Sequence, residues 1–575
     1  VFEGCDNITT LVIGNGLTTL NNQFSGKTKL ANVTLGNGFR ELNGTFSGCA
    51  ALEHITLPDS LKTIGSNTFS GCVSLKEIIF PEKLKTINPD AFYGCSSLDS
   101  IAFPDSLTYL DSRIFGNCEK LRIVNMGKGV NSIHSYNNVF ENCPNIEKVY
   151  FSPKLTTIPA LFNGKTNLTT VILGDSVKTI GGSAFAGCAQ LSSINIPNTA
   201  TTIEDYAFNG CAGLTDIKLP DSLRALGAYS FTGAGLESIT IPNKLKTLRE
   251  RTFASCPNLK TVVLGDSLES IVADYSATFY ETPNITTVKF GKGMKEINNA
   301  FGGQANLTTV VLGDSIKVIG NSAFNGCAAL KSINIPNTAR TIGDYAFAGC
   351  TALTNITLPD SLQTLGGYAF SGAGLTNITI PNKVKELRER TFASCPNLTT
   401  VVLGDSLKTI VSDYSGAFRD TPNITSVTFG NGIEEINSAF SGQTKLTKVI
   451  LGKKVKTIGN NAFSGCTSLA SFSFPETITN LGTSAFNGAG LRTLTLPSKL
   501  TQIPEMAFYN CDSLRSIILG KQITQIANNA FGECDSIREV TVDNTIPEII
   551  NIASSFASMR KISFGVSVTE IPDNL

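Results

Sequence analysis

The chain has 575 residues with 46 basic and 46 acidic side chains, so its formal net charge is zero. From this balance, with charged residues at only 16%, we expect no basic stripe of the kind that nucleic acid demands of a partner. Dinucleotide fingerprints, P-loops and metal-binding spacings are absent, and no apolar run approaches the ~18 residues that cross a bilayer. The sequence therefore predicts no cofactor, no metal, no nucleic acid and no membrane insertion.

Phenylalanine recurs along the whole chain at a nearly constant spacing. Twenty-five of these landmark residues, from Phe2 to Phe556, follow one another mostly at steps of 22 or 23 residues. A fixed period of about 20 to 30 residues is typical of a solenoid, in which each unit buries its apolar face against its neighbours. We therefore expect a single β-rich solenoid over residues 1–575, with about 25 coils of 22–26 residues.

One repeat unit is legible over residues 52–74. Residues 55–57 alternate between apolar and polar, which predicts a short strand. Pro58 ends that strand because proline offers no N–H to a ladder, and a second extended piece follows over residues 61–64. Gly71 then supplies backbone freedom at a tight bend. No part of the unit has the length of an ordinary helix, so little or no regular helix is expected.

The pattern L-x-x-I-x-L-P-x-S-L-x-x-I-G-x-x-A-F-x-G-C is present in nearly every coil. It resembles the BspA-like (Treponema-type) leucine-rich repeat, which occurs in surface proteins of bacteria and some parasitic protists. The resemblance covers essentially the whole chain. It implies a right-handed, curved solenoid with a parallel sheet on the concave face, and it implies display outside the cell or on the cell surface.

A longer period lies on top of the coil period. The widest steps, of 25 or 26 residues, lead into Phe140, Phe279, Phe418 and Phe556, so six coils form one super-unit. The four predicted super-units, followed by a partial coil to 575, span about 1–138, 139–278, 279–417 and 418–555. Because the chain begins and ends within a coil, we expect it to be a piece of a longer array.

All 15 cysteines stand at one repeat position, three residues after the landmark phenylalanine. A disulfide framework is one interpretation in an exported protein. However, stacked coils would hold neighbouring cysteine side chains parallel rather than converging. Cys5, Cys256, Cys395 and Cys466 also have no cysteine in the neighbouring coils. We therefore expect buried free thiols that act as small apolar residues.

The outward positions of the predicted strands are one candidate for a binding surface. Each is the middle residue of an I-x-L stretch, most are β-branched or small, and Tyr150 is among them. Two interpretations stay open. In one, a parallel sheet simply favours such residues. In the other, they form a low-relief adhesive strip that gains from multivalency.

The longest coils offer a second candidate. Their two or three extra residues include Tyr136, then Asp274 and Tyr275, and then Asp413 and Tyr414. A repeated bulge that presents these side chains could contact a partner, since loops on rigid scaffolds often do. Alternatively, the insertion only widens one corner, with its tyrosine packed against the next coil.

Two charged runs of the form Arg-Glu-Arg, at 249–251 and 388–390, are predicted to be solvated faces that pair internally.

We weigh two classes of function, and neither is enzymatic. The first, which the family resemblance implies and which we favour, is a surface adhesin that binds extracellular proteins or glycans of a host or neighbouring cell. The second is a structural protein that associates end to end into an extracellular fibre or surface layer. Open strand edges invite pairing, and a head-to-tail contact that does not close gives a filament.

Overall fold

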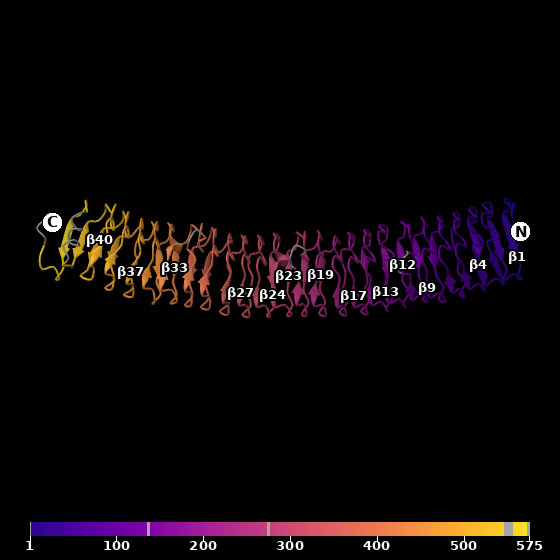
Figure 1. Ribbon diagram of the computed structural model, residues 1–575, viewed down its shortest axis with the longest axis horizontal. Coiled ribbons are helices and arrows are strands. Elements are labelled where there is room, and N and C mark those ends of the chain that lie inside the picture. Colours follow the sequence, from indigo (N-terminus) through magenta and orange to yellow (C-terminus); the bar gives the residue numbers. More distant parts are fainter. Residues whose placement is uncertain (1, 135–137, 273–276, 413–414, 546–555, 572–575) are drawn as a thin grey trace. The chain divides into compact units, whose positions relative to one another are not determined.

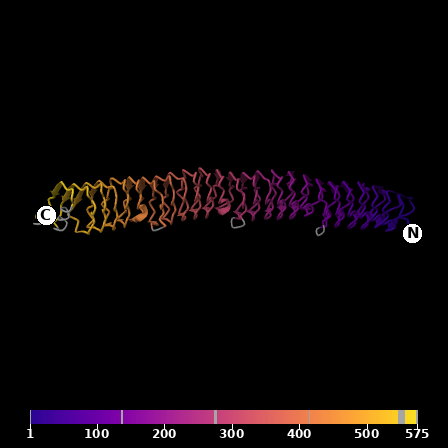
Figure 2. The ribbon, with the colours of Figure 1, turned by 90° about the horizontal axis from the view of Figure 1, so that it is seen from above.

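The structure, a computed structural model, describes residues 2–134, 138–272, 277–412, 415–545 and 556–571. Its internal contacts divide the chain into two units, Val1–Ile285 and Thr286–Leu575. Within each unit the coils follow one another in sequence order, as Figures 1 and 2 show. Most coils carry two short strands. The first series of strands holds the I-x-L stretch, and the second series lies after the turn.

The strands of the first unit are short. Those of its first series are β1 (Thr10–Ile13), β3 (Asn32–Leu35), β5 (His54–Thr56), β8 (Ser100–Ala102), β10 (Ile123–Asn125), β12 (Lys148–Tyr150), β14 (Thr170–Ile172), β16 (Ser193–Ile194), β19 (Ser238–Thr240) and β21 (Thr261–Val263). Those of its second series are β2 (Thr19–Asn21), β4 (Glu41–Asn43), β6 (Thr63–Ile64), β7 (Thr86–Ile87), β9 (Tyr109–Leu110), β11 (Ser132–Ile133), β13 (Thr157–Ile158), β15 (Thr179–Ile180), β17 (Thr202–Ile203), β18 (Ala225–Leu226), β20 (Thr247–Leu248) and β22 (Ser270–Ile271).

The second unit repeats this arrangement. Its first series contains β23 (Thr287–Lys289), β25 (Thr309–Val311), β29 (Asn377–Thr379), β31 (Thr400–Val402), β33 (Ser426–Thr428), β35 (Lys448–Ile450), β38 (Thr493–Thr495), β40 (Ser516–Leu519), β42 (Glu539–Val542) and β43 (Lys561–Phe564). Its second series contains β24 (Glu296–Ile297), β26 (Val318–Ile319), β27 (Thr341–Ile342), β28 (Thr364–Leu365), β30 (Glu386–Leu387), β32 (Thr409–Ile410), β34 (Glu435–Ile436), β36 (Thr457–Ile458), β37 (Asn480–Leu481), β39 (Gln502–Ile503) and β41 (Gln525–Ile526). The helical elements of the described residues are two 3-10 turns, η1 (Asn299–Phe301) and η2 (Ser438–Phe440).

Strands of one series pair in parallel with strands of the same series in adjacent coils. β12 lies between β10 and β14, so Val149 stands opposite Val124 on one side and Val171 on the other. In the second series, Ile158 of β13 stands opposite Ile180 of β15. Each residue therefore stacks on the residue at the same repeat position in the next coil. The predicted β-solenoid with essentially no helix is confirmed, whereas the super-unit boundaries stay a prediction.

The turns of the coil follow from proline and glycine. The N–H of Leu61 donates to the carbonyl oxygen of Pro58 at 3.0 Å, which closes the turn after the first strand. At the next corner Gly71 adopts φ 74°, a left-handed conformation that strains a residue with a side chain. Its N–H donates to the carbonyl oxygen of Tyr93 in the following coil at 2.7 Å. The predicted glycine bend is confirmed, and it also ties two coils together.

The landmark phenylalanines form an apolar stack inside each unit. In the first unit the rings of Phe92 and Phe115 lie 5.2 Å apart, with their planes 8° from parallel. In the second unit the rings of Phe347 and Phe370 lie 5.3 Å apart, with their planes 9° from parallel. All four side chains are fully buried. Because most of these rings stack on the ring of an adjacent coil, the core of a unit is largely one column rather than a separate core in every repeat.

The cysteines line the core beside this stack. Fourteen of the fifteen are buried free thiols, and Cys5 is exposed. The thiol of Cys95 donates to the carbonyl oxygen of Phe69 at 3.2 Å, and the thiol of Cys350 donates to that of Phe324 at 3.3 Å. Each acceptor belongs to the landmark phenylalanine of the preceding coil. The expected burial is confirmed for fourteen cysteines and is wrong for Cys5, which lies in the first coil of the chain. The repeated thiol hydrogen bond adds a link between coils that sequence analysis did not reveal.

Burial also changes the acidity of these thiols. It raises the pKa of Cys49 to about 11 and the pKa values of Cys95 and Cys188 to about 12, because the interior disfavours the charged thiolate. The thiolate is the nucleophile and the metal ligand in cysteine chemistry. These three thiols therefore serve packing and hydrogen bonding in the folded chain.

Replacing Phe347 with alanine should lower the free energy of unfolding by about 3–5 kcal/mol, because it deletes a fully buried ring. The ring lies between Phe324 and Phe370, so the cavity would open between coils. Thr357→Ala, on an exposed position of the following coil, should change the free energy by less than about 0.5 kcal/mol. Denaturant unfolding followed by circular dichroism measures both. An unchanged midpoint for Phe347→Ala would contradict the phenylalanine stack as the core.

The thiol reagent DTNB should modify Cys5 at once in the folded chain and the other fourteen cysteines only after denaturation, since those fourteen are buried. Absorbance of the released thiolate counts the reacted groups. Prompt reaction of several thiols in the folded chain would contradict the buried column.

Stability should fall as the pH rises above about 8.5, the ordinary pKa of an unfolded thiol. Above that pH the unfolded chain loses thiol protons that the folded chain keeps, because the folded pKa values of Cys49 and Cys95 are about 11 and 12. Below that pH both states are protonated and the thiols contribute no pH dependence. Urea unfolding between pH 7 and pH 10 measures this slope, and Cys95→Ala should make it shallower.

Candidate functional site

β12 presents one buried and two exposed side chains, as the alternation of a strand requires. Val149 is fully buried, whereas Lys148 and Tyr150 face solvent. Tyr150 stands opposite Ile172 of β14, and the two side chains are 39% and 51% exposed. Two large apolar groups therefore lie side by side on the solvent face of the sheet.

Uncharged side chains flank this pair. Asn125 of β10 stands opposite Tyr150 on the other side, and Ala102 of β8 stands opposite Asn125. Asn195 directly follows β16, which pairs with β14. We call Ala102, Asn125, Tyr150, Ile172 and Asn195, all exposed, the strand face. None of the five is charged, so covering them removes no charge from water. The nearest charge on the same face of β12 is the exposed Lys148, two residues before Tyr150.

The second unit repeats the apolar position of the strand face. Val311 follows Ile172 by 139 residues and Ile450 follows Val311 by the same interval. Their side chains are 48% and 43% exposed. Opposite them stand Lys289 and Thr428, at the place that Tyr150 occupies in the first unit. The branched apolar residue thus recurs, whereas the tyrosine belongs to the first unit.

Of the site residues predicted from sequence, Tyr150 lies in the described part of the chain, and the structure places it on an exposed strand as expected. Tyr136, Asp274, Tyr275, Asp413 and Tyr414 lie outside the described residues. The proposed contact of the long coils therefore stays a prediction.

Tyrosine pairs that sequence analysis did not single out form another feature of each unit. Tyr206 stacks on Tyr229 with ring centres 4.8 Å apart, and Tyr345 stacks on Tyr368 at 4.6 Å. All four adopt left-handed backbone, with φ between 57° and 61°, two residues before a landmark phenylalanine. Tyrosine at that repeat position in adjacent coils was the signal available in the sequence.

The two Arg-Glu-Arg runs pair internally, as predicted. Nη1 of Arg249 lies 2.9 Å from Oδ1 of Asp205, and Nε of Arg388 lies 2.8 Å from Oε1 of Glu386. All four side chains are about half exposed, so solvent screens these pairs and they contribute little to stability.

The second arginine of each run is not a solvated group. The guanidinium carbon of Arg251 lies 4.4 Å from the ring centre of Tyr280, and that of Arg390 lies 5.8 Å from the ring centre of Tyr368. Both arginines are half-buried, and neither Nε atom has a hydrogen-bond partner. Attraction between the cation and the ring face explains these positions, so the prediction of a solvated face is wrong for Arg251 and Arg390.

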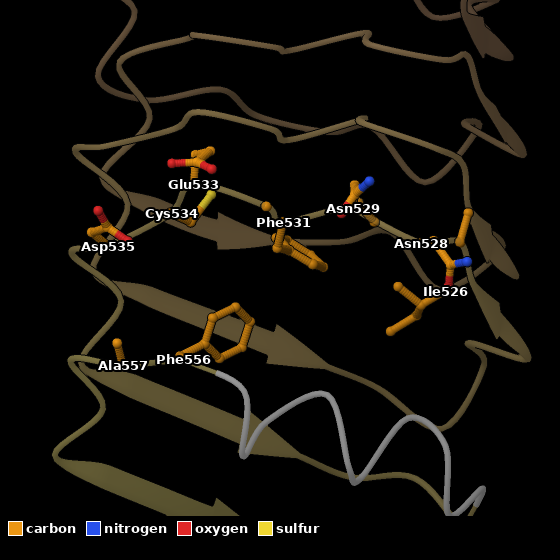
Figure 3. Close-up of a pocket in the computed structure, with 12 residues that line it drawn as sticks. Ile526, Asn528, Asn529, Phe531, Glu533, Cys534, Asp535, Phe556 and Ala557 are labelled. Atoms are coloured by element: carbon orange, nitrogen blue, oxygen red, sulfur yellow. The ribbon is translucent and has the colours of Figure 1, made fainter.

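Two concavities of the described surface carry acidic side chains in their linings. One of about 590 Å³ in the first unit is lined by Glu204, Asp205 and Arg249 among others. Another, of about 550 Å³, is lined by Phe531 and Phe556 among others, whose rings stand nearly perpendicular (Figure 3). Histidine lines neither one. Among the described residues, no three histidine, cysteine or acidic side chains gather closely enough to hold a metal ion.

A search for bilayer-spanning segments in the described parts of the chain found no helix of sufficient length and apolar character.

Solved structures with similar folds come from several bacteria. A leucine-rich repeat protein from Bacteroides ovatus is 28% identical, over 69% of this chain and 91% of that chain, with a TM-score of 0.38. A leucine-rich cell surface protein from Faecalibacterium prausnitzii is 24% identical over 68% and 83%, with a TM-score of 0.24. The leucine-rich repeat protein of T. pallidum is 27% identical over 32% and 78%, with a TM-score of 0.23.

A comparison with curated proteins finds no match. The family profile of the BspA type leucine rich repeat region, in contrast, matches this chain in six copies. The matched residues, which together span nearly the whole chain, are 1–89, 43–161, 159–276, 274–399, 317–443 and 437–563. Such repeats are typically non-enzymatic and are consistent with a surface that binds other proteins. The chain belongs to the BspA-type leucine-rich repeat family.

Proposed function

We propose that this chain is a non-enzymatic adhesion protein displayed outside the cell or on the cell surface. It binds extracellular proteins or glycans of a host or neighbouring cell. Membership of the BspA-type family supports the proposal, since the repeat is one that surface proteins carry. The neutral balance of 46 basic and 46 acidic residues agrees with it, because it gives no general attraction for nucleic acid.

The exposed apolar pair of the strand face carries the proposal. Tyr150 and Ile172 stand side by side with 39% and 51% of their surfaces in water. Covering them releases water from apolar surface, which favours association. Tyrosine is also enriched among the residues that contribute most to protein interfaces. The pair therefore has the composition of an interface centre, with small and amide side chains around it.

The strand face is rigid before a partner arrives. Val149 and Val171, the buried residues beside the exposed pair, are 0% and 3% exposed, and their strands pair in parallel register. A preordered surface loses little conformational freedom on binding, so more of the contact free energy appears as affinity. Val311 and Ile450 offer the same apolar contact again in the second unit. Several weak contacts on one chain would together bind a repetitive partner tightly.

Replacing Tyr150 with serine and Ile172 with threonine in the full chain should weaken binding at least about fivefold, because two exposed apolar contacts are lost. Binding to immobilised collagen, laminin and fibronectin, followed by surface plasmon resonance, measures the change. Adding Val311→Thr and Ile450→Thr should weaken binding further, because Val311 and Ile450 hold the equivalent positions in the second unit.

A matched control changes the second strand series of the same coils. Thr157→Ser and Thr179→Ser, which stand opposite each other on β13 and β15, should leave the affinity unchanged. Equal affinities for the strand-face variant and this control would overturn the strand face as the binding site. If the purified chain forms end-to-end fibres in electron micrographs and binds none of the three proteins, the structural-protein alternative replaces adhesion.

A further inference from the structure

One position of every coil, the residue directly before the first strand, forms a column along each unit. We call it the ladder position. In the last coils of the second unit it is occupied by arginine. The N–H of Arg515 donates to the carbonyl oxygen of Arg492 at 2.9 Å, Arg538 donates to Arg515 at 2.9 Å, and Arg560 donates to Arg538 at 2.8 Å. The four side chains therefore leave the backbone from adjacent coils, at the strand spacing of ~4.8 Å.

In the first unit the same position carries alternating charge. Glu53, Lys76, Asp99, Arg122 and Glu147 follow one another in consecutive coils. Nζ of Lys76 lies 2.8 Å from Oε2 of Glu53, and Nε of Arg122 lies 2.7 Å from Oδ1 of Asp99. The cations of that column are thus satisfied by their own neighbours.

In the middle of the second unit the ladder position is neutral. The hydroxyl groups of Thr376, Thr399, Thr425 and Thr447 donate to the carbonyl oxygen of the threonine in the preceding coil, at 3.0 to 3.2 Å. This column also satisfies itself, and it carries no charge that requires an external partner.

The arginines of the last coils differ from the alternating-charge column and from the threonine column. We call Arg492, Arg515, Arg538 and Arg560 the arginine row. All four side chains are exposed. Within the described residues, none of their guanidinium groups forms an ion pair or a side-chain hydrogen bond, in contrast to Lys76 and Arg122. The row lies beside β40 in the yellow part of Figure 1.

Acidic residues near the arginine row do not form ion pairs with its guanidinium groups. Asp512 and Asp535 precede Arg515 and Arg538 by three residues, and Glu539 directly follows Arg538. None of the three acidic side chains forms an ion pair within 4.0 Å in the described structure, although several ion pairs of that kind occur elsewhere in the chain. Four like charges at the spacing of adjacent strands repel one another until an anion lies between them.

We propose that the arginine row binds a linear sulfated polysaccharide. Guanidinium groups form paired, charge-assisted hydrogen bonds with flat or tetrahedral oxyanions, which lysine does less well. Three steps of ~4.8 Å give a row of roughly 14 Å, long enough to engage several sulfate groups along one chain. The site goes beyond the proposed strand-face contact, since it uses different residues in the other unit and a different chemistry.

The surroundings of the row favour a polysaccharide over a nucleic acid. The outward residues of the neighbouring strands include Thr495, Ile518, Thr541 and Ser563. Directly after the four arginines stand Thr493, Ser516, Glu539 and Lys561, so most of the outward side chains beside the row carry a hydroxyl group. Hydroxyl groups can hydrogen-bond to sugars and sulfates. Proteins that bind single-stranded nucleic acid instead place several aromatic rings for base stacking beside their cations. On these four strands the aromatic side chain is Phe564 alone, 37% exposed at the end of β43.

The test measures binding of a heparin-derived decasaccharide to the full chain by isothermal titration calorimetry. We expect binding at about 0.15 M salt that weakens as salt is added, because anion contacts release counterions. The fully desulfated decasaccharide should not bind. Arg515→Gln with Arg538→Gln should weaken binding at least about tenfold, since both central guanidinium groups are lost. Melting curves followed by circular dichroism verify that the variant is folded.

The matched control removes the same charge from the same column of the first unit. Lys76→Gln with Arg122→Gln should change the affinity by less than about twofold, because those cations are already paired. Equal losses in the two variants, or no heparin binding to the unmodified chain, would overturn the proposal. Oligo-dT binding as tight as heparin binding would also overturn it and would assign the row to nucleic acid. None of these three results depends on whether matrix proteins bind the strand face.

Discussion

In-register parallel pairing of coils is the constraint on which the rest of this structure depends. Val124, Val149 and Val171 stand opposite one another in three successive coils, and the paired residues of the second strand series are aligned in the same way. A side chain therefore meets, above and below, the side chains at its own repeat position. The effect of a residue on stability therefore depends mainly on the side chains at the same repeat position in the adjacent coils, and much less on its neighbours in sequence.

This constraint explains why such different chemistries share one architecture. The phenylalanine column stacks rings 5.2 Å apart, as Phe92 and Phe115 do, and the cysteine column adds thiol hydrogen bonds to the carbonyl groups of the preceding coil. Both are self-complementary, so they tolerate repetition. Exposed columns have more freedom because water can satisfy them. It is on those columns that the uncharged strand face and the arginine row are found.

Sequence periodicity predicts the internal columns well because burial acts on every coil alike. The spacing from Phe2 to Phe556 indicated the stack, and the position of Cys95 indicated a buried thiol. The surface was harder to predict. The cation–ring contact of Arg251 needs the left-handed backbone that brings it over Tyr280, and local sequence does not display that conformation. The arginine row was missed for another reason, because Arg492 and Arg515 are 23 residues apart and become neighbours only when the coils are aligned.

The alternating ladder of the first unit makes some changes in the number of coils slightly more favourable than others, since its half-exposed ion pairs are individually weak. Glu53, Lys76, Asp99 and Arg122 have a charge period of two coils, whereas the backbone has a period of one. Loss of the coil that carries Lys76 would set Glu53 beside Asp99, but loss of that coil together with the next would set Glu53 beside Arg122. Gain or loss of coils in this stretch is therefore tolerated more readily in pairs. The threonine column of the second unit has the same uncharged residue in each coil. Gain or loss of a single coil there brings no like charges together.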